Sequence, residues 1–319
     1  MRVLVISSID SDAIAKMSSE HDVKCHVNPD EATLSQLIQD REVLILRSGV
    51  FVNAGVMDSA PELKLIIRAG CGLDNIDVEH ARRRCIKLHT IPQPAAFAVS
   101  EMTFALMLAL ARRVLEAHAA WSRGKWLKTQ LKGRLLYGKT LGIIGAGNIG
   151  SRVGQLGNAL GMRVLGCVEY PTPERAQEYL KKNIELTDLD KVVAEADFLT
   201  IHVPKKESTK YLVNADVLAN MKKDSFLVNI ARGGVVDEKA LYHELTEGSR
   251  LLGAALDVHE QEGDGKISPF ADMHNVILTP HIGSMTVDTY KDMGIRILRI
   301  LNSFVAKQGE SQVAQEALA

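Results

Sequence analysis

Short runs of apolar and β-branched residues alternate with amphipathic stretches along about the first 90 residues of the chain. Runs of this kind predict strands, and the stretches between them, such as Asp12–Ser19 and Thr33–Ile38, have the spacing of helices. The predicted strands are Val3–Ser7, Asp22–His26, Val43–Arg47, Lys64–Ile67 and Ile86–His89. Strands that alternate with helices in this way predict parallel βαβ units with helices on both faces of a sheet.

A second α/β series follows a long apolar helix in the middle of the chain. This helix is predicted from about Val99 to Trp121, and apolar residues cover nearly its whole circumference, which is typical of a helix packed on several sides. The strands after it are predicted at Thr140–Ile144, Arg163–Val168, Phe198–Val203, Phe226–Ile230, Leu252–Asp257 and Val276–Thr279. A final helix at about Thr286–Phe304 and a polar tail complete the pattern. We therefore expect an α/β protein with two doubly wound parallel-sheet domains.

Composition and charge narrow the classes of function. A length of 319 residues suits two domains of ordinary size, and a net charge of -1 provides no field that would attract nucleic acid or an anionic membrane. The 4 cysteines have neither a CxxC pair nor the spacing of metal ligands, which is typical of reduced cytoplasmic thiols and predicts no metal site.

The sequence also predicts a cytoplasmic protein without a targeting or membrane segment. The first residues enter a strand pattern directly, without the charged-then-apolar pattern of a signal peptide. The most apolar helical stretch, Met102–Ala111, is too short to span a bilayer, which takes roughly 20 residues.

A glycine-rich loop is the strongest single motif. Gly145, Gly147 and Gly150 have the Gly-x-Gly-x-x-Gly spacing, with the strand Thr140–Ile144 before them and a predicted helix, Ile149–Leu160, after them. In such a loop the first glycine allows a tight turn, the second lets a pyrophosphate approach the backbone, and the third lets helix and strand pack closely. The helix N-terminus adds N–H groups for the phosphates. The motif predicts dinucleotide binding; the alternative is a purely structural turn.

An acidic residue about 20 positions beyond such glycines usually bonds the ribose hydroxyls of the dinucleotide. Here Glu169 is the only carboxylate within reach of the strand end, and no Arg or Lys follows it directly. Because a carboxylate repels the 2′-phosphate of NADP, we expect NAD as the cofactor, in preference to NADP. The alternative is that Glu169 is a solvated charge at the strand end.

Three downstream segments each place one polar side chain beyond a predicted strand, namely Arg232, Glu262 and His281. In open α/β sheets ligands bind beyond the carboxyl ends of the strands, so these side chains form a candidate acid–base site. Each alone also has a structural interpretation: a strand-end salt bridge for Arg232, a solvated loop charge for Glu262, and a capped structural histidine for His281.

The three residue types suit hydride transfer between a nicotinamide and a 2-oxo acid. Reduction leaves an alkoxide that must be protonated, and His281 can donate that proton near neutral pH. Glu262 would favour the protonated imidazolium form of this histidine. Arg232 can bind the substrate carboxylate through two hydrogen bonds and polarise the 2-oxo group. The sequence thus predicts an oxidoreductase.

Together these segments make the chain resemble the D-isomer-specific 2-hydroxyacid dehydrogenase family over nearly its whole length. Within that family it is most similar to short 3-phosphoglycerate dehydrogenases that lack a C-terminal regulatory extension. The matching stretches are Leu46–Ser48, Ile67–Asp77, the glycine loop, Ile230–Glu238, Leu256–Glu262 and Thr279–Ser284. The resemblance implies a flavodoxin-like substrate domain made of residues 1–95 and 288–319. A Rossmann coenzyme domain, residues 96–287, would be inserted between them, with catalysis in the cleft.

The resemblance also implies the roles of the site residues. Arg232, Glu262 and His281 would be the catalytic triad. The coenzyme would contact Gly145, Gly147, Asn148, Ile149, Gly150, Glu169, His202, Val203, Pro204, Thr209, Ala231, Asp257 and Gly283. The substrate would contact Arg47, Ser48, Arg68, Ala69, Gly70, Cys71 and Gly72. For His202 the residues alone favour a structural or cofactor-lining histidine over a second catalytic one, and the resemblance agrees.

Two arginines indicate the class of substrate. In the phosphoglycerate-type enzymes the positions of Arg47 and Arg68 face the far anionic end of the substrate, where arginines suit a phosphate, a sulfonate or a second carboxylate. The alternative for both is a surface salt bridge. We expect a dianionic D-2-hydroxy acid, with 3-phosphoglycerate and phosphohydroxypyruvate as the first candidates.

Three positions depart from the family's pattern. The acidic ribose residue usually stands where this chain has Val168, and Ala95 lies near the place of an asparagine in a loop that faces the substrate. Gly263 follows the catalytic glutamate in place of a proline, which predicts a more flexible loop. The first departure concerns the choice between NAD and NADP, and the second concerns the identity of the substrate.

Two other functions and one partner follow from the same resemblance. A dinucleotide-sensing binding protein is the main alternative, because some corepressors share this fold; those proteins carry additional terminal segments. Enzymes that oxidise formate typically have glutamine where this chain has Glu262, so Glu262 favours the hydroxy-acid reaction.

The resemblance also implies a homodimer, because family members dimerise through the coenzyme domain and the apolar helix at Val99–Trp121 fits such an interface. The alternative is a helix buried within one subunit.

Overall fold

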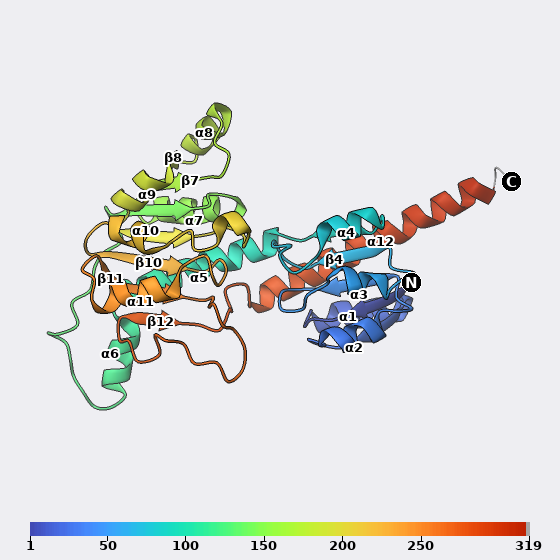
Figure 1. The fold of residues 1–319 in the computed structure, drawn as a ribbon, viewed down its shortest axis with the longest axis horizontal. Helices are drawn as coiled ribbons and strands as arrows, with labels where there is room; N and C mark the ends of the chain where they lie inside the picture. The colour runs from blue at the N-terminus through green and yellow to red at the C-terminus, as the bar shows by residue number, and fades with distance from the viewer. Residues whose placement is uncertain (317–319) are drawn as a thin grey trace. The chain divides into compact units, whose positions relative to one another are not determined.

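The computed structural model of the chain describes the backbone of residues 1–316 and the side chains of residues 1–308. The chain divides into two compact units (Figure 1), one formed by Met1–Ala95 and the chain from Met285 onward, the other by Ala96–Ser284. Each unit is an α/β domain built on one parallel sheet, of 5 strands in the first and 7 in the second. The predicted fold class of two doubly wound parallel sheets is confirmed.

The first unit has the flavodoxin-like strand order β2-β1-β3-β4-β5. Its strands are β1 (Arg2–Val5), β2 (Asp22–Cys25), β3 (Val43–Leu46), β4 (Leu65–Arg68) and β5 (Lys87–Thr90). Val43 and Ile45 belong to the apolar cluster on one face of the sheet, and Leu44 and Leu46 to the cluster on the other. Because successive strand residues point to opposite faces, a continuous apolar run marks a strand that is buried on both sides.

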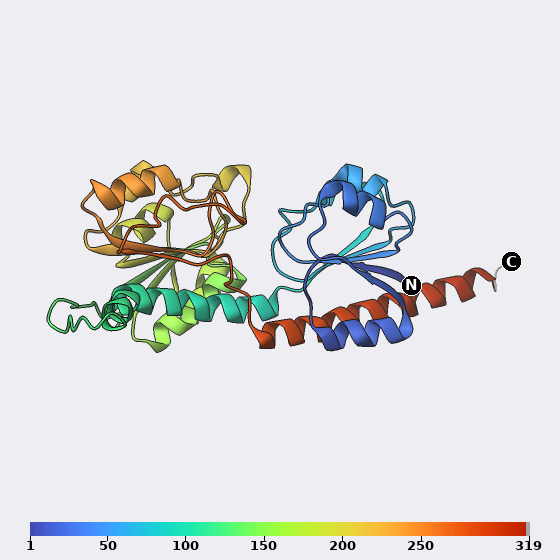
Figure 2. The same cartoon turned by 90° about the horizontal axis from the view of Figure 1, so that it is seen from below.

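Helices cover both faces of this sheet (Figure 2). One face carries α1 (Ser11–Glu20) and α12 (Val287–Glu316), and the other carries α2 (Glu31–Leu37), α3 (Ala54–Asp58) and α4 (Val78–Arg83). Each of α1 to α4 begins after an Asp or Asn whose side chain accepts a hydrogen bond from the backbone N–H three residues on, the usual N-cap. These polar N-cap residues lie between the apolar runs that the sequence pattern predicts as strands.

The last helix is longer than predicted. Met293, Ile297, Leu301 and Phe304 recur at helical spacing and pack on the sheet of the first unit. Beyond Phe304 the backbone stays helical to Glu316, within the segment predicted as a polar tail.

The second unit has the strand order β12-β11-β10-β9-β6-β7-β8. Its strands are β6 (Thr140–Ile144), β7 (Arg163–Cys167), β8 (Glu185–Leu186), β9 (Phe198–Ile201), β10 (Ser225–Asn229), β11 (Leu251–Leu256) and β12 (Val276–Leu278). The chain adds strands on one side of β6 up to β8 and then on the other side from β9 onward, so the order reverses at β6. In open α/β sheets such a reversal marks the crevice in which ligands bind. β8 is only 2 residues long, too short for a periodic pattern, and the sequence analysis missed it.

Two helical layers enclose the sheet of the second unit. α5 (Gln93–Ala111) and α7 (Asn148–Ala159) pack on one face. On the other face lie α9 (Leu189–Glu195), α10 (Ala215–Asn220) and α11 (Glu238–Thr246). α8 (Pro173–Leu180) follows β7, and a short 3-10 helix, η1 (Glu207–Thr209), follows β9.

The long helix predicted at Val99–Trp121 is in fact two helices. α5 ends at Ala111 and α6 (Val114–Trp121) starts after Arg113, which has a φ of 52°. The Arg113 guanidinium donates to both carboxylate oxygens of Glu116, at 2.9 and 2.8 Å, and to the backbone oxygen of Gln130. These bonds hold a left-handed residue that an α-helix cannot contain.

α5 is also longer than the apolar stretch considered in the sequence. By length and composition it is the one helix of the described chain that could cross a membrane, with a mean hydropathy of 1.6. However, 67% of that stretch is buried inside the protein, as in the core helix of an α/β domain.

Candidate active site

Parallel strands bring residues far apart in the sequence to one edge of the second sheet. Arg232 follows β10, Asp257 follows β11 and His281 follows β12, and these three strands are neighbours. Because all strands of the sheet are parallel, their carboxyl ends lie at the same edge. The glycine loop follows β6 at that same edge.

The glycine loop has the backbone geometry that a dinucleotide needs. Gly145 has a φ of 90°, and a Cβ at Gly150 would lie 2.3 Å from the oxygen of Gly145, so neither position tolerates a side chain. By contrast, a Cβ at Gly147 would meet nothing within 4 Å. Gly147 is also the N-cap of α7 and provides no side-chain bond to its first N–H groups. The open side of Gly147 and the uncapped helix N-terminus fit a bound pyrophosphate.

The residues after β9 lie behind this loop. A Cβ at Gly145 would come within 2.7 Å of the backbone oxygen of His202. The Nε2 atom of His202 lies 3.0 Å from Oγ1 of Thr200, and burial lowers the pKa of His202 to about 3. The ring is therefore neutral near pH 7 and cannot donate the catalytic proton as an imidazolium. Thr209 donates from Oγ1 to the backbone oxygen of Pro204 at 2.7 Å and so closes the turn that follows.

Glu169 lies two residues beyond β7 and is exposed. Its Oε2 atom accepts a hydrogen bond from Nζ of Lys206 at 2.9 Å, and this bond lowers the pKa of Glu169. The sequence analysis missed Lys206. The only signal for it was the pair of lysines, Lys205 and Lys206, just after the strand end of β9. The carboxylate expected at the coenzyme ribose is thus already paired with a cation.

His281 and Glu262 form a hydrogen-bonded pair. The Nδ1 atom of His281 lies 2.9 Å from Oε2 of Glu262, and the two side chains are 32% and 40% exposed, so solvent can reach both. Burial raises the pKa of Glu262, but the hydrogen bond and charge of His281 outweigh it and hold that pKa below its ordinary value. Glu262 therefore remains a carboxylate throughout the neutral range and can accept a hydrogen bond from Nδ1 of His281.

The backbone of His281 is in the left-handed region, with a φ of 56°. Such a conformation is uncommon for a residue with a side chain and costs of order 1–3 kcal/mol. Two backbone hydrogen bonds hold this conformation. The N–H of His281 donates to the backbone oxygen of Asp257 at 2.7 Å and to the backbone oxygen of Thr279 at 3.1 Å. The surrounding loop thus fixes the direction of the ring.

Asp257 organises this loop through its side chain. The carboxylate is 1% exposed and accepts hydrogen bonds from the Thr279 hydroxyl at 2.6 Å, the Ile282 N–H at 2.9 Å and the Gly283 N–H at 2.8 Å. A Cβ at Gly283 would lie 2.9 Å from Oδ2 of Asp257, which explains the glycine. Asp257 and Gly283, which were predicted only as coenzyme contacts, therefore also shape the loop that carries His281.

Arg232 lies on the turn after β10, next to the buried Ala231. Its Nη1 atom donates to the backbone oxygen of Ala231 at 2.7 Å, and the amide of Asn229 bonds both the N–H of Ala231 and the oxygen of Arg232. A Cβ on the next residue, Gly233, would lie 1.8 Å from the backbone oxygen of His259. The loops that carry Arg232 and Glu262 are therefore in direct backbone contact.

The predicted substrate residues belong to the first unit, at the carboxyl ends of β3 and β4. Arg47 and Arg68 are only 8% and 4% exposed, so both side chains are largely buried. The guanidinium of Arg47 lies 4.3 Å from the centre of the Tyr290 ring. Nη1 of Arg68 donates to the backbone oxygen of Ala69 at 2.9 Å, and a Cβ at Gly70 would fall 2.1 Å from that nitrogen. Gly70 has a φ of 153°, which favours glycine, and its lack of a side chain leaves room for the Arg68 guanidinium.

The remaining predicted substrate residues lie on the same two loops. Ser48 is exposed on the turn after β3. Cys71 and Gly72 follow β4, and Sγ of Cys71 lies 3.3 Å from the backbone oxygen of Pro92.

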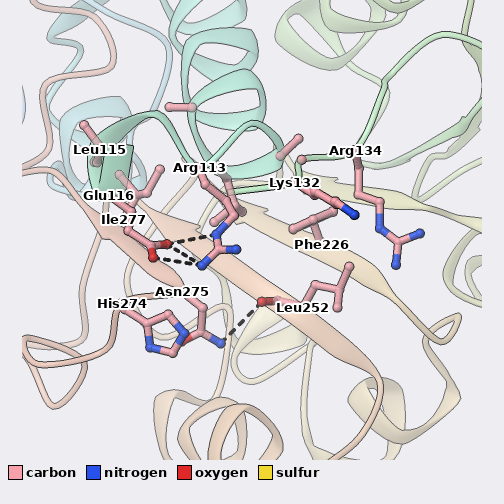
Figure 3. Close-up of a pocket in the computed structure, with 14 residues that line it drawn as sticks. Arg113, Leu115, Glu116, Lys132, Arg134, Phe226, Leu252, His274, Asn275 and Ile277 are labelled. Carbon is pink, nitrogen blue, oxygen red and sulfur yellow. Dashed lines mark hydrogen bonds and ion pairs between the residues drawn. The ribbon is translucent and has the colours of Figure 1, made fainter. Parts of the chain in front are cut away.

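A hollow of about 350 Å³ lies at the opposite edge of the second sheet (Figure 3). Its lining includes Phe226, Leu252 and Ile277, the second residues of β10, β11 and β12, so it lies at the amino ends of these strands. The ion pair between Arg113 and Glu116 points into it. This hollow is not part of the predicted site.

Comparison with known proteins gives a consistent result. The family model described as "D-isomer specific 2-hydroxyacid dehydrogenase, NAD binding domain" matches residues 104–283. The chain is 40% identical over 295 residues to a D-3-phosphoglycerate dehydrogenase of Methanocaldococcus jannaschii, a match that covers 92% of the chain and 55% of the relative. It is 38% identical over 302 residues to a hydroxypyruvate reductase of Thermotoga maritima, covering 93% of the chain and 96% of the relative. The chain thus spans about half the length of the first of these relatives and nearly all of the second.

A solved structure has a similar fold over nearly the whole chain. A D-lactate dehydrogenase from Aquifex aeolicus, in complex with NAD and lactic acid, superposes with a TM-score of 0.85 at 28% identity. The superposition covers 97% of this chain and 96% of that one.

Proposed function

The chain belongs to the D-isomer-specific 2-hydroxyacid dehydrogenase family, and from this premise we propose that it is an NAD-dependent oxidoreductase acting on a small 2-hydroxy or 2-oxo acid. The observation that carries the proposal is the hydrogen bond of 2.9 Å between His281 and Glu262 at the sheet edge that also bears the glycine loop. Its compartment would be the cytoplasm, because the four cysteines form no disulfide in the described part of the chain.

Each group at the site has a distinct task in this proposal. Gly145, Gly147 and Gly150 would hold NAD(H), which when bound would supply or accept the hydride. Arg232 binds the substrate carboxylate and polarises the 2-oxo group. His281 holds a proton at Nε2 and gives it to the developing alkoxide, or takes it back in the reverse direction. Glu262, bonded to Nδ1, orients the ring and stabilises its protonated form.

The substrate proposed is a dianionic D-2-hydroxy acid, with 3-phosphoglycerate as the first candidate. Arg47 and Arg68 lie at the carboxyl ends of the neighbouring strands β3 and β4, where open α/β sheets bind their ligands. Two such arginines suit a phosphate or a second carboxylate at the far end of the substrate. Relatives named D-3-phosphoglycerate dehydrogenase and hydroxypyruvate reductase support both a phosphorylated and an unphosphorylated three-carbon acid.

We expect phosphohydroxypyruvate to be the best substrate in an NADH-oxidation screen that also includes sulfopyruvate, oxaloacetate, hydroxypyruvate, glyoxylate and pyruvate. Replacing Arg47 with methionine should raise KM for the dianionic acids by about tenfold to a hundredfold, because one charge-assisted hydrogen bond contributes roughly 1.5–3 kcal/mol. KM for pyruvate and glyoxylate should stay within about twofold.

The matched control is Arg2, which starts β1 at the amino-terminal edge of the same sheet, away from the carboxyl ends of the strands, and pairs with Glu42. Arg2→Met should leave both groups of substrates unaffected. If the Arg47 variant has an unchanged KM for every dianionic acid, Arg47 has a structural role and does not bind the substrate. If wild-type protein binds NADH but turns over none of the acids, the dinucleotide-sensing alternative becomes the better one.

The enzyme should prefer NADH to NADPH, but only by on the order of tenfold in kcat/KM. Glu169 repels a 2′-phosphate, whereas Lys206 at 2.9 Å neutralises part of that charge. Glu169→Gln should therefore lower or invert the ratio of kcat/KM for NADH to that for NADPH, and Lys206→Gln should increase it. Parallel shifts in the two variants would show that this pair does not select the coenzyme.

The chain should form a homodimer through its second unit. α6 is an apolar helix with no buried residue, and Trp121 and Trp126, whose ring centres are 4.8 Å apart, are 61% and 67% exposed. Exposed apolar clusters of this kind usually mark an interface. Light scattering should give a mass about twice the 34.9 kDa of one chain, and the double variant Trp121→Glu with Trp126→Glu should give one chain. A monomeric wild-type protein at micromolar concentration would refute this proposal.

A further inference from the structure

We propose that Glu238 and Glu260 are positioning residues that hold the loop carrying Glu262 in the register needed to bond His281. Neither was among the residues singled out in the sequence. The inference rests on the proposed function, because it assigns Glu262 and His281 the proton transfer.

The two glutamates exchange hydrogen bonds in a reciprocal brace. The carboxylate of Glu238 accepts from the backbone N–H of Glu260 at 2.7 Å, and the carboxylate of Glu260 accepts from the backbone N–H of Glu238 at 3.0 Å. Each side chain thus satisfies a backbone donor of the other segment. Glu238 is the first residue of α11, so one of these donors belongs to the otherwise unsatisfied N–H groups of a helix N-terminus.

The brace joins the loops of the proposed triad. Glu238 lies six residues after Arg232, and Glu260 lies two residues before Glu262. A Cβ at Gly233 would lie 1.8 Å from the oxygen of His259, so the same two loops also touch through their backbones. The Tyr211 hydroxyl adds a third segment, since it donates to Oε2 of Glu260 at 3.3 Å.

From the brace the contacts lead directly to the His281–Glu262 pair. The backbone N–H of His259 donates to Oε1 of Glu262 at 3.2 Å, while Oε2 of Glu262 bonds His281. The Nε2 atom of His259 lies 3.0 Å from the backbone oxygen of Thr279, on the loop of His281. The position of residues 259 and 260 therefore sets where both carboxylate oxygens of Glu262 lie.

Electrostatics alone would not place these carboxylates together. Burial raises the pKa of Glu238, and the nearby charges of Glu260 and Glu262 add to the rise. Like charges at such short range repel, so the arrangement persists only because the backbone bonds compensate. What the brace requires of Glu238 is an acceptor oxygen and not a charge, which means that glutamine can replace it.

The surroundings make the brace testable without disrupting a core. Glu238, His259 and Glu260 line a hollow of about 450 Å³ together with Tyr242, Ile267 and Pro269. Because the side chain of Glu238 borders this hollow, its truncation leaves no new buried cavity. Gly263, directly after Glu262, has a φ of 116°, and a Cβ at this position would meet no atom of the described residues within 4 Å. The loop therefore has no packing support on that side, which makes the brace more important.

The experiment compares Glu238→Ala with Glu238→Gln and with a matched control on the same helix, Glu244→Ala. Glu244 also binds a backbone N–H through its carboxylate, that of Arg250 at 2.7 Å, but near the other end of α11. For each variant we would measure kcat, KM and NADH affinity, together with amide hydrogen exchange of residues 258–263. Glu262→Gln and the double variant Glu238→Ala with Glu262→Gln complete a mutant cycle.

Glu238→Ala should lower kcat by about tenfold to a hundredfold, the range expected for a small displacement of a catalytic group, with NADH affinity unchanged. Glu238→Gln should recover most of the loss, and Glu244→Ala should show none. In the Glu262→Gln background the alanine variant should have no further effect, because residues that act as a unit are non-additive. Exchange at residues 258–263 should become faster in Glu238→Ala only.

Three results would overturn the inference: equal losses in Glu238→Ala and Glu244→Ala, an additive effect in the double variant, or unchanged exchange at 258–263. If the wild-type protein reduces no 2-oxo acid, the proposed function fails. The exchange measurement then still decides whether the brace holds the loop.

Discussion

Replacing His281 with asparagine is expected to lower kcat/KM for reduction of the preferred 2-oxo acid by about 10²–10⁴-fold, the usual contribution of a positioned general acid. Asparagine is preferred to alanine in this test because His281 has a φ of 56°, a backbone conformation that asparagine adopts more readily than alanine does. The variant thus removes the proton donor and keeps the loop. Initial rates of NADH oxidation measure the effect, and NADH binding should remain within about twofold.

His243→Ala is the control for this variant. His243 lies on α11, pairs with Glu247 and is 71% exposed, so its loss should leave kcat/KM unaffected. A His281→Asn enzyme that retained more than about a tenth of the wild-type rate would mean that another group or water donates the proton.

Replacing Arg232 with alanine is expected to lower kcat/KM by about 10²–10³-fold, because the substrate carboxylate and the developing alkoxide both lose a preorganised cation. Lysine should recover only part of the loss, since an ammonium keeps the charge but not the paired donors of a guanidinium. The effect should appear in kcat as well as in KM, because polarisation of the 2-oxo group acts in the transition state. Steady-state kinetics across pH 6 to 9, roughly the range in which histidine and the thiols titrate, would separate it from a change in protonation.

Arg163→Ala is the control for Arg232. Arg163 starts β7, at the other edge of the sheet, and bonds Glu185 at 3.0 Å and Glu195 at 2.6 Å. Its removal should change stability slightly and catalysis not at all. An Arg232→Ala enzyme with wild-type kcat/KM would contradict the assignment of Arg232 to the substrate.

The predictions that concern contiguous residues were confirmed most fully. The strand predicted at Thr140–Ile144 has the same bounds in β6, and the glycines after it have the conformation that their spacing predicts. Both are local properties, because a short run of apolar residues and the backbone freedom of glycine depend on a few neighbouring residues. The predictions that failed concern where elements stop: α5 ends at Ala111 because Arg113 turns left-handed, and α12 continues past Phe304.

By itself the sequence determined the fold class, the dinucleotide loop and the three side chains of the proposed triad. Parallel strand ends share one edge, so the order of strands and polar residues indicated a candidate acid–base site, and the family resemblance implied the triad. The tertiary structure decided which groups hold one another. The bond between Glu169 and Lys206 spans 37 residues, and those between Glu238 and Glu260 span 22. The left-handed backbone of His281 depends on its bond to the oxygen of Asp257. Such contacts form only when separate strands adopt a common register, so no local pattern in the chain specifies them.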